Sequence, residues 1–355
     1  MDPRASSTVG IIVNPHAGKD IRRLTSGASQ TPDATKIGIL RRVAAGALEQ
    51  GADRLVMSSD SHRLAERAVA GLGGSIEYVE GPRTGSHLDT IACAETMWKQ
   101  DVGTVVALGG DGTCRDVATG WPDVPLIAIS TGTNNVFPAA IDGTAAGVAA
   151  ALVATGSVQL DEVSARSKRV SIHIDDPSKS SVVHEEALVE AALISTTFVG
   201  ARAVTDPSSV RWVVACLADP ASTGLSGVAG RLHPIGRGDD AGVLIRLGSG
   251  GRRLRVPLAP GTFATLDVAS VEPLPMATPI ELGGRGVIAY DGERTSPVAD
   301  DATVTVSIER SGPQVIDVRT VMATAAADHR FDVATDDQAS SASTTTATRT
   351  DSDGD

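Results

Sequence analysis

A glycine-rich segment in the first third of the chain carries its densest chemical signal. The segment reads Gly109-Gly110-Asp111-Gly112-Thr113 and follows an apolar run that ends at Leu108. Glycines between a strand and a helix let backbone N–H groups approach phosphate oxygens, and the helix N-terminus adds partial positive charge. No Walker A lysine follows, and Arg115 stands where the dinucleotide fingerprint has its third glycine. This glycine loop predicts a phosphate-binding turn, with a tight turn capped by Asp111 as the alternative.

Two further polar loops follow predicted strands. The first loop, Asn14-Pro15-His16-Ala17-Gly18-Lys19, comes after the apolar residues 9–13, and the third loop, Thr131-Gly132-Thr133-Asn134-Asn135-Val136-Phe137, comes after residues 126–129. In a parallel α/β sheet, ligands bind outside the carboxyl ends of the strands. We therefore expect the three loops to converge on one crevice that suits a polyphosphate, although each alone would be an ordinary turn.

The elements that must position these loops alternate along the first half of the chain. Short apolar, β-branched runs predict strands, and helical spacing of apolar residues predicts the helices between them. The predicted strands are 9–13, 54–57, 75–79, 104–108 and 126–129, and the predicted helices are 37–50, 61–72, 89–99 and 144–155, with another near Cys114. This alternation indicates an α/β domain with a parallel sheet covered on both faces, over residues 1–156.

The sequence pattern changes after Gly156. Short strand-like runs at 170–174, 243–247, 254–257 and 303–308 are separated by Gly and Pro, as at 248–251 and 257–261. We expect a mostly β domain over residues 157–331, whose final segment is free to pack back on the first domain. Residues 332–355 are rich in Ser, Thr and Asp with almost nothing apolar, which predicts a disordered acidic tail.

Composition excludes several classes of protein. The net charge is −12 and aromatic residues make up 3% of the chain, which argues against a nucleic-acid partner. The three cysteines, Cys93, Cys114 and Cys216, are too few and too far apart for a zinc cluster or a disulfide framework, and the histidines form no metal-binding pattern, so no metal site is expected. Without a signal peptide or an apolar run of about 18 residues, the expected location is the cytoplasm, with no membrane partner.

The order of the three loops resembles that of the NAD kinase and diacylglycerol kinase superfamily. The matching residues are Asn14-Pro15-x-Ala17-Gly18, the glycine loop, and Thr131-Gly132-Thr133-x-Asn135-x-Phe137. Thr84-Gly85 with Asp89-Thr90, and the run 124–129, are most similar to the ATP-NAD kinase-like branch associated with acetoin catabolism. The resemblance implies an N-terminal, Rossmann-like parallel-sheet domain, a mostly β C-terminal domain and a crevice between them.

The resemblance also implies a reaction, the transfer of the γ-phosphoryl group of ATP, or a phosphoryl group of polyphosphate, to a hydroxyl group. The acceptor it favours is the adenosine-ribose 2′-hydroxyl of NAD. Asp111 is the candidate base, and Mg²⁺ would be held largely by phosphate oxygens and water. The residues assigned to nucleotide and phosphate binding are Asn14, Gly109, Gly110, Gly112, Thr113, Thr131, Gly132, Thr133 and Asn135. Lys19 is either a point charge for a phosphate or a solvated lysine.

The second domain resembles the superfamily more loosely. Glu190, Thr223 and Ser226 are the candidate acceptor-binding residues, with Val189 where NAD kinases carry Asn, and Asp291-Gly292-Glu293 is similar to an Asp-Gly-Glu turn of the lipid kinases. A carboxylate can accept two hydrogen bonds from a ribose diol. The alternatives are a lipid or small-polyol kinase of the same superfamily and a non-catalytic nucleotide sensor. Relatives often associate through the β domain, so a homo-oligomer is an expectation.

Overall fold

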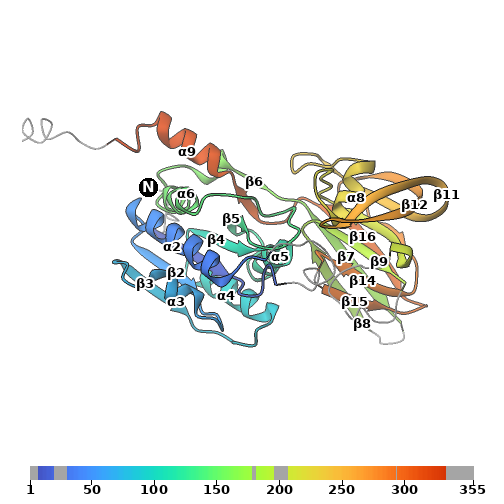
Figure 1. The fold of residues 1–355 in the computed structure, drawn as a ribbon, viewed down its shortest axis with the longest axis horizontal. Helices are drawn as coiled ribbons and strands as arrows, with labels where there is room; N and C mark the ends of the chain where they lie inside the picture. Colours follow the sequence, from blue (N-terminus) through green and yellow to red (C-terminus); the bar gives the residue numbers. More distant parts are fainter. Residues whose placement is uncertain (1–6, 20–29, 178–180, 196–206, 293, 333–355) are drawn as a thin grey trace, which may run out of the picture.

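The structure is a computed structural model that describes residues 7–19, 30–177, 181–195, 207–292 and 294–332. Glu293 and the predicted tail from residue 333 onward lie outside the described residues. Two bodies lie side by side, with α/β architecture at one end of the long axis and β-sheets at the other (Figure 1). The predicted fold class, a parallel-sheet domain followed by a mostly β domain, is confirmed.

The first body is built on a seven-stranded sheet in the order β3-β2-β1-β4-β5-β17-β6. Its five N-terminal strands, all parallel, are β1 (Thr8–Val13), β2 (Arg54–Ser58), β3 (Ser75–Val79), β4 (Thr104–Gly109) and β5 (Pro125–Ser130). The strands β1 and β4 are buried along their whole length, as strands covered on both faces must be.

Helices cover both faces of this sheet. They are α2 (Asp33–Glu49), α3 (Leu64–Val69), α4 (His87–Lys99), α5 (Asp111–Gly120) and α6 (Gly143–Ala154), with a short α7 (Leu160–Val163) after them. Apolar residues of α2, α3 and α6 share one core with Val9 and Ile11, whereas those of α4 and α5 share another core with Ile12. Because successive residues of β1 point to opposite faces, one strand serves both cores.

The strand order reverses between β1 and β4. From β1 the chain moves outward through β2 and β3, and then returns to add β4 and β5 on the other side of β1. Loops that leave neighbouring strands in opposite directions open a crevice at the carboxyl edge of the sheet, which is where ligands bind in such folds. The first loop and the glycine loop both start at this point.

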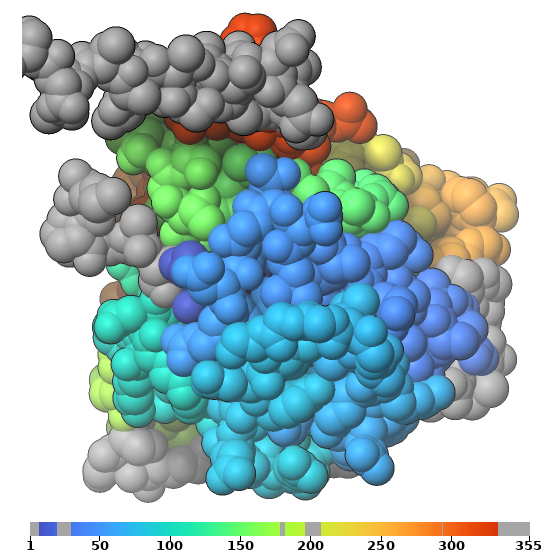
Figure 2. Space-filling model, turned by 90° about the vertical axis from the view of Figure 1, so that its left-hand side faces the viewer, coloured from blue at the N-terminus to red at the C-terminus, as the bar shows by residue number. Residues whose placement is uncertain are grey.

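The end of the described chain returns to the first sheet. β17 (Gln314–Ile316) pairs in parallel with β5 and antiparallel with β6 (Ser164–Arg166), and α9 (Val318–Ala327) packs beside α6 (Figure 2). These residues fall within 157–331, the range that the sequence assigned to the second domain. We therefore propose that the first domain includes them and that the second domain is inserted between Arg166 and Gln314. Three-residue strands are too short to carry a recognisable pattern.

The second domain is a pair of antiparallel sheets packed face to face. The six-stranded sheet has the order β12-β11-β10-β9-β14-β15, and the four-stranded sheet has the order β13-β16-β7-β8. Apolar residues of both sheets share one core, and α8 (Gly224–Leu232) covers the outer face of the larger sheet. The strands are β7 (Arg169–Asp176), β8 (Ser181–Ala187), β9 (Glu190–Ile194), β10 (Val210–Ala215), β11 (Ala241–Ala259), β12 (Thr262–Pro275), β13 (Ile280–Leu282), β14 (Gly286–Tyr290), β15 (Arg294–Val298) and β16 (Thr303–Glu309), with a 3₁₀ turn at Pro207–Ser209.

Several predicted boundaries differ from the structure. The glycine segment 248–251 does not separate two strands, because β11 continues through it with shifts in register against β12. A side chain at Gly251 would place Cβ 2.0 Å from the carbonyl oxygen of Val268, so the irregularity requires glycine. The predicted helix 61–72 forms only as α3, and α5 begins at Asp111 rather than near Cys114. Among the described helices, none is long and apolar enough to cross a bilayer.

Candidate active site

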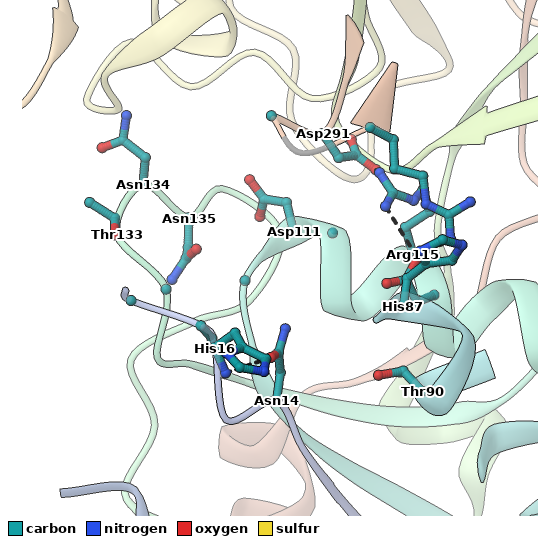
Figure 3. A pocket seen from close by; sticks show the side chains of 18 of the residues that line it. Asn14, His16, His87, Thr90, Asp111, Arg115, Thr133, Asn134, Asn135 and Asp291 are labelled. Atoms are coloured by element: carbon teal, nitrogen blue, oxygen red, sulfur yellow. Dashed lines mark hydrogen bonds and ion pairs between the residues drawn. The ribbon is translucent and has the colours of Figure 1, made fainter. Parts of the chain in front are cut away.

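A cavity of about 780 Å³ lies between the two domains at the carboxyl ends of β1 and β4. The first loop, the glycine loop, the third loop and the N-terminus of α4 line it from the first domain. The turn between β14 and β15, the start of β9 and the N-terminus of α8 line it from the second. Figure 3 shows Asp111 in this cavity between Asn135 and Asp291.

The first loop is tied to the glycine loop through Asn14. Its backbone N–H donates to the carbonyl oxygen of Leu108 at 3.0 Å, and its side-chain Nδ2 donates to Oγ1 of Thr113 at 2.9 Å. Its Oδ1 accepts from the backbone N–H of His16 at 2.8 Å. Asn14 therefore uses both ends of its amide to fix its own loop against α5.

The third loop packs directly on the other two. The backbone N–H of Thr131 donates to the carbonyl oxygen of Gly109 at 2.9 Å. Gly18 has φ of +71°, and a Cβ on it would lie 2.6 Å from the carbonyl oxygen of Thr131. A Cβ on Gly132 would lie 3.0 Å from Cα of Gly110. Glycine is needed where these backbones approach one another, and the three loops form one surface.

Asp111 is the first residue of α5, but its carboxylate does not cap that helix. Oδ1 instead accepts from the backbone N–H groups of Phe137 at 2.8 Å and Val136 at 3.0 Å, in the third loop. Burial, together with the negative charge of Asp291, raises the pKa of Asp111 to about 7, although the two N–H donors and Arg237 act in the opposite direction. A carboxyl group with a pKa near neutrality is well suited to accept a proton from a hydroxyl group.

Asp291 approaches the cavity from the second domain. Its Oδ2 accepts from the backbone N–H of Leu188 and its Oδ1 from that of Val189, both at 2.9 Å. Its backbone has φ of 46°, an uncommon conformation for a residue other than glycine. Burial raises the pKa of Asp291, while Arg115, 3.8 Å away, lowers it. The carboxylate holds the start of β9 in place, and with it Glu190.

A buried ionic network joins the two domains beside the cavity. Oδ1 of Asp116 accepts from Nη2 of Arg115 at 3.1 Å and from Nη2 of Arg294 at 3.0 Å. Arg115 also donates to the carbonyl oxygen of Tyr290 at 3.2 Å. Burial and Arg294 lower the pKa of the nearby His87, which also lines the cavity. Sequence reasoning did not select these four residues, because their partners lie up to 178 positions apart.

The predicted phosphate-binding residues divide into two groups. Those that line the cavity are Asn14, Gly110, Gly112, Gly132, Thr133 and Asn135. The other three, Gly109, Thr113 and Thr131, are buried behind it. Thr113 is the acceptor for Asn14, and Gly109 is the last residue of β4. Their contribution is to the backbone that carries the lining residues.

The predicted acceptor-binding residues also differ from one another. Glu190 and Thr223 line the cavity, and the hydroxyl of Thr223 donates to Oδ1 of Asn134 across the domain boundary. Ser226 lines the cavity as well, but its hydroxyl donates to the carbonyl oxygen of Leu217 at 2.8 Å. Ser226 is buried and its hydroxyl proton is already used, so it supports α8 more directly than it could bind a ligand.

Lys19 lines the cavity within a small polar cluster. Its Nζ lies 2.8 Å from Oδ1 of Asp33 and 3.2 Å from Nδ1 of His62. The hydrogen bond from Lys19, together with His62, lowers the pKa of Asp33 to about 2. Lys19 is therefore paired, and its positive charge is shared with a carboxylate at the edge of the cavity.

Comparisons with known proteins match the two domains separately. Residues 9–158 match the family model of the ATP-NAD kinase N-terminal domain, and residues 168–311 match that of the acetoin catabolism protein X C-terminal domain. Acetoin catabolism protein X of Cupriavidus necator is 34% identical over 334 residues, covering 90% of this chain and 93% of that protein. An uncharacterised protein of Archaeoglobus fulgidus is 31% identical over 131 residues, covering 37% of this chain and 36% of that protein.

A solved structure shares the fold over both domains. It is the yeast NADH kinase in complex with NADH, which superimposes with a TM-score of 0.52 at 14% sequence identity. The similarity covers 92% of this chain and 89% of the yeast chain. The two proteins therefore share the overall fold.

Proposed function

This chain belongs to the family of acetoin catabolism protein X, and from that premise we propose that it is a phosphotransferase with an alcohol group as acceptor. The donor is ATP or polyphosphate, and the acceptor we place first is the 2′-hydroxyl of the adenosine ribose of NAD. The match of the first domain to the ATP-NAD kinase N-terminal domain supports this assignment. A reaction that consumes ATP and NAD fits the cytoplasm.

The observation that carries the proposal is the setting of Asp111. Its carboxylate lies in the crevice where the strand order reverses, held by two backbone N–H groups, with a pKa of about 7. Glycines on both sides, Gly110 and Gly112, leave room for two substrates to approach it. Phosphoryl transfer depends mainly on positioning and on a carboxylate that accepts the proton of the attacking hydroxyl.

The proposed reaction requires little covalent chemistry from the protein. The acceptor hydroxyl oxygen forms a bond to the γ-phosphorus of ATP while the bond between that phosphorus and the bridging oxygen breaks. Asp111 takes the hydroxyl proton, ADP leaves with the bridging oxygen, and Asp111 later releases the proton to water. The first and third loops would hold the phosphates through Asn14, Thr133, Asn135 and nearby backbone N–H groups.

Mg²⁺ would enter as part of the nucleotide substrate. In the part of the chain that the structure describes, no three metal-binding side chains form a cluster. The carboxylates of Asp111 and Asp291 already accept backbone hydrogen bonds. The two carboxylates therefore fit a Mg²⁺ ion that takes most of its ligands from phosphate oxygens and water. When bound, the ion would neutralise the charge that develops on the phosphates.

The experiment is an acceptor panel with the purified protein. The protein is incubated with Mg²⁺ and either ATP or polyphosphate, and with NAD, NADH or a diacylglycerol, and NADP(H), phospholipid and ADP are measured. The proposal predicts NADP or NADPH. Phosphorylated lipid would instead identify a lipid kinase, and ATP binding without any product would favour a nucleotide sensor.

A further inference from the structure

Lys36 is a fully buried lysine directly behind the first loop. It lies in the first turn of α2, and its exposed fraction is 0%. Its Nζ donates to the carbonyl oxygen of Pro15 at 2.8 Å and to that of Asn14 at 3.2 Å. Lysine is seldom fully buried, because removing an ammonium group from water is costly unless the group is paired.

No carboxylate within the described residues pairs with this ammonium group at ion-pair distance. The charged groups that face it are Lys19 from the first loop, Asp33 from its own helix and Asp60 from the loop after β2. Asp33 is paired with Lys19, and the carboxylate of Asp60 accepts backbone N–H groups at the start of α3. Burial lowers the pKa of Lys36 to about 8, so the ammonium form persists at neutral pH.

Resting on the proposed nucleotide donor, we propose that Lys36 is a positioning residue for the polyphosphate site. Its ammonium group holds the carbonyl oxygens of Asn14 and Pro15 on the side of the loop that faces α2. The same two residues line the cavity, and the Asn14 side chain reaches Thr113. Lys36 thus fixes the loop and places a positive charge behind it, where it attracts phosphate through a short stretch of low-dielectric protein.

This role separates two pH trends that a merely structural lysine would not separate. Because folding lowers the pKa of Lys36 from 10.5, the unfolded chain binds more protons between about pH 8 and 10.5, and the folded protein gains stability there as pH rises. Nucleotide affinity should fall over the same range, because the neutral amine no longer supplies the charge. Opposite slopes for stability and affinity are the signature of the proposal.

The chain offers a matched control in Lys168. It is also buried, with 1% of its surface exposed, and its Nζ donates to the carbonyl oxygens of Gly236 and Ala241 at 2.9 and 2.8 Å. Lys168 does not line the cavity. Lys36→Met and Lys168→Met each leave two carbonyl oxygens without their donor, so their effects on folding are comparable, but only Lys36 is adjacent to the nucleotide site.

The test is the affinity for a non-hydrolysable ATP analogue with Mg²⁺, measured by calorimetry at pH 7 and pH 9. With a pKa of about 8, Lys36 is charged in roughly one-tenth of the molecules at pH 9. The part of the wild-type affinity that depends on this charge should therefore fall about tenfold from pH 7 to pH 9. Lys36→Met should bind weakly at both pH values and lack this decrease, whereas Lys168→Met should behave like the wild type. Titration of Asp111 affects both variants equally.

Equal affinities and equal pH profiles for the two variants would overturn the role of Lys36. If Lys36→Met does not fold, the same titration is made in Asp111→Asn protein, in which Lys36 is the titrating group, and an unchanged affinity between pH 7 and pH 9 overturns the proposal. If the wild type binds neither the ATP analogue nor inorganic polyphosphate, the proposed function itself is overturned, and the inference with it.

Discussion

Oδ1 of Asp111 lies 2.8 Å from the backbone nitrogen of Phe137, so the third loop orients the carboxylate that begins α5. The contact replaces the helix cap that an aspartate at this position could have formed. Two backbone hydrogen bonds fix Oδ1, and Oδ2 accepts a longer one, at 3.3 Å, from the backbone N–H of Val136. The proposed base is therefore positioned before any substrate binds.

Asp111→Asn should abolish phosphoryl transfer, with a loss in kcat of about a thousandfold or more, because an amide cannot take the hydroxyl proton. The amide oxygen can still accept from Val136 and Phe137, so nucleotide affinity should stay within a few-fold. Steady-state kinetics and calorimetry measure the two quantities. Asp142→Asn is the control, since Asp142 also accepts backbone N–H groups but lies outside the cavity. Near-normal kcat in Asp111→Asn would remove Asp111 from the mechanism.

The reaction rate should rise with pH through the pKa of Asp111, about 7. The base must be deprotonated to act, so kcat/KM should increase about tenfold per pH unit below pH 6 and flatten as the pH approaches 8. A pH–rate profile between pH 5 and pH 8 measures this. A rate that is flat across that range would contradict the assignment of the base.

Stability should show the same ionisation with the opposite sign. Folding raises the pKa of Asp111 from 3.8 to about 7, so its protonated form favours the folded state, and that contribution is lost as pH rises through 7. Asp111→Asn cannot ionise and should lose less stability than the wild type between pH 5 and pH 8, by on the order of 2 kcal/mol. Urea unfolding at the two pH values provides the comparison. Parallel losses in both proteins would show that Asp111 titrates normally.

Gly18→Ala should disrupt the contact between the first and third loops. Gly18 and Gly261 share a φ of +71°, but a Cβ on Gly18 would lie 2.6 Å from the carbonyl oxygen of Thr131, whereas nothing lies within 4 Å at Gly261. Both alanine variants carry the backbone cost of roughly 1–2 kcal/mol. Only Gly18→Ala should lose further stability and raise the KM for ATP, as thermal unfolding and kinetics would show. Equal behaviour of the two variants would mean that the loops are not packed as described.

Asp116→Asn should weaken the ionic network between the domains. One buried oxygen of Asp116 forms ion pairs with both Arg115 and Arg294. Removing its negative charge leaves the positive charges of two guanidinium groups without this partner. The expected loss is about 3 kcal/mol in free energy of unfolding. Asp267→Asn breaks an exposed pair with Arg253 and should have no measurable effect. Similar losses in the two variants would argue against a special role for the buried network.

Sequence reasoning located the parts of the site that lie within single loops. The strands before these loops are apolar, β-branched runs, and the loops consist of residue types that form turns, so the loops could be placed at the strand ends without coordinates. The resemblance to the kinase superfamily then singled out Asn14, Asp111 and Asn135, which all line the cavity. The start of α5 was placed too late because Gly110 and Gly112 are poor helix formers, yet Gly110 occupies the N-cap position and Gly112 the first turn.

The remaining site residues depend on distant contacts. Arg115 was noted only as a departure from a fingerprint, and its significance comes from Asp291 and Tyr290, which the fold of the second domain brings to it. In the sequence, Lys36 looks like an ordinary polar residue near the start of a helix. It is buried because the first loop packs on α2 and accepts hydrogen bonds from its ammonium group. Pairings across more than a hundred residues leave no local pattern in one sequence.

The position of β17 determines the order in which this chain can complete its first domain. The strand lies between β5 and β6 in the seven-stranded sheet, yet it is the last strand of the described chain. During synthesis, β5 keeps an open edge until the whole second domain has emerged, and an open edge is a site for aggregation. Contacts of such long sequence separation also slow folding. A fragment that ends before Gln314 would leave this edge unpaired, so the first domain should be studied in the whole chain.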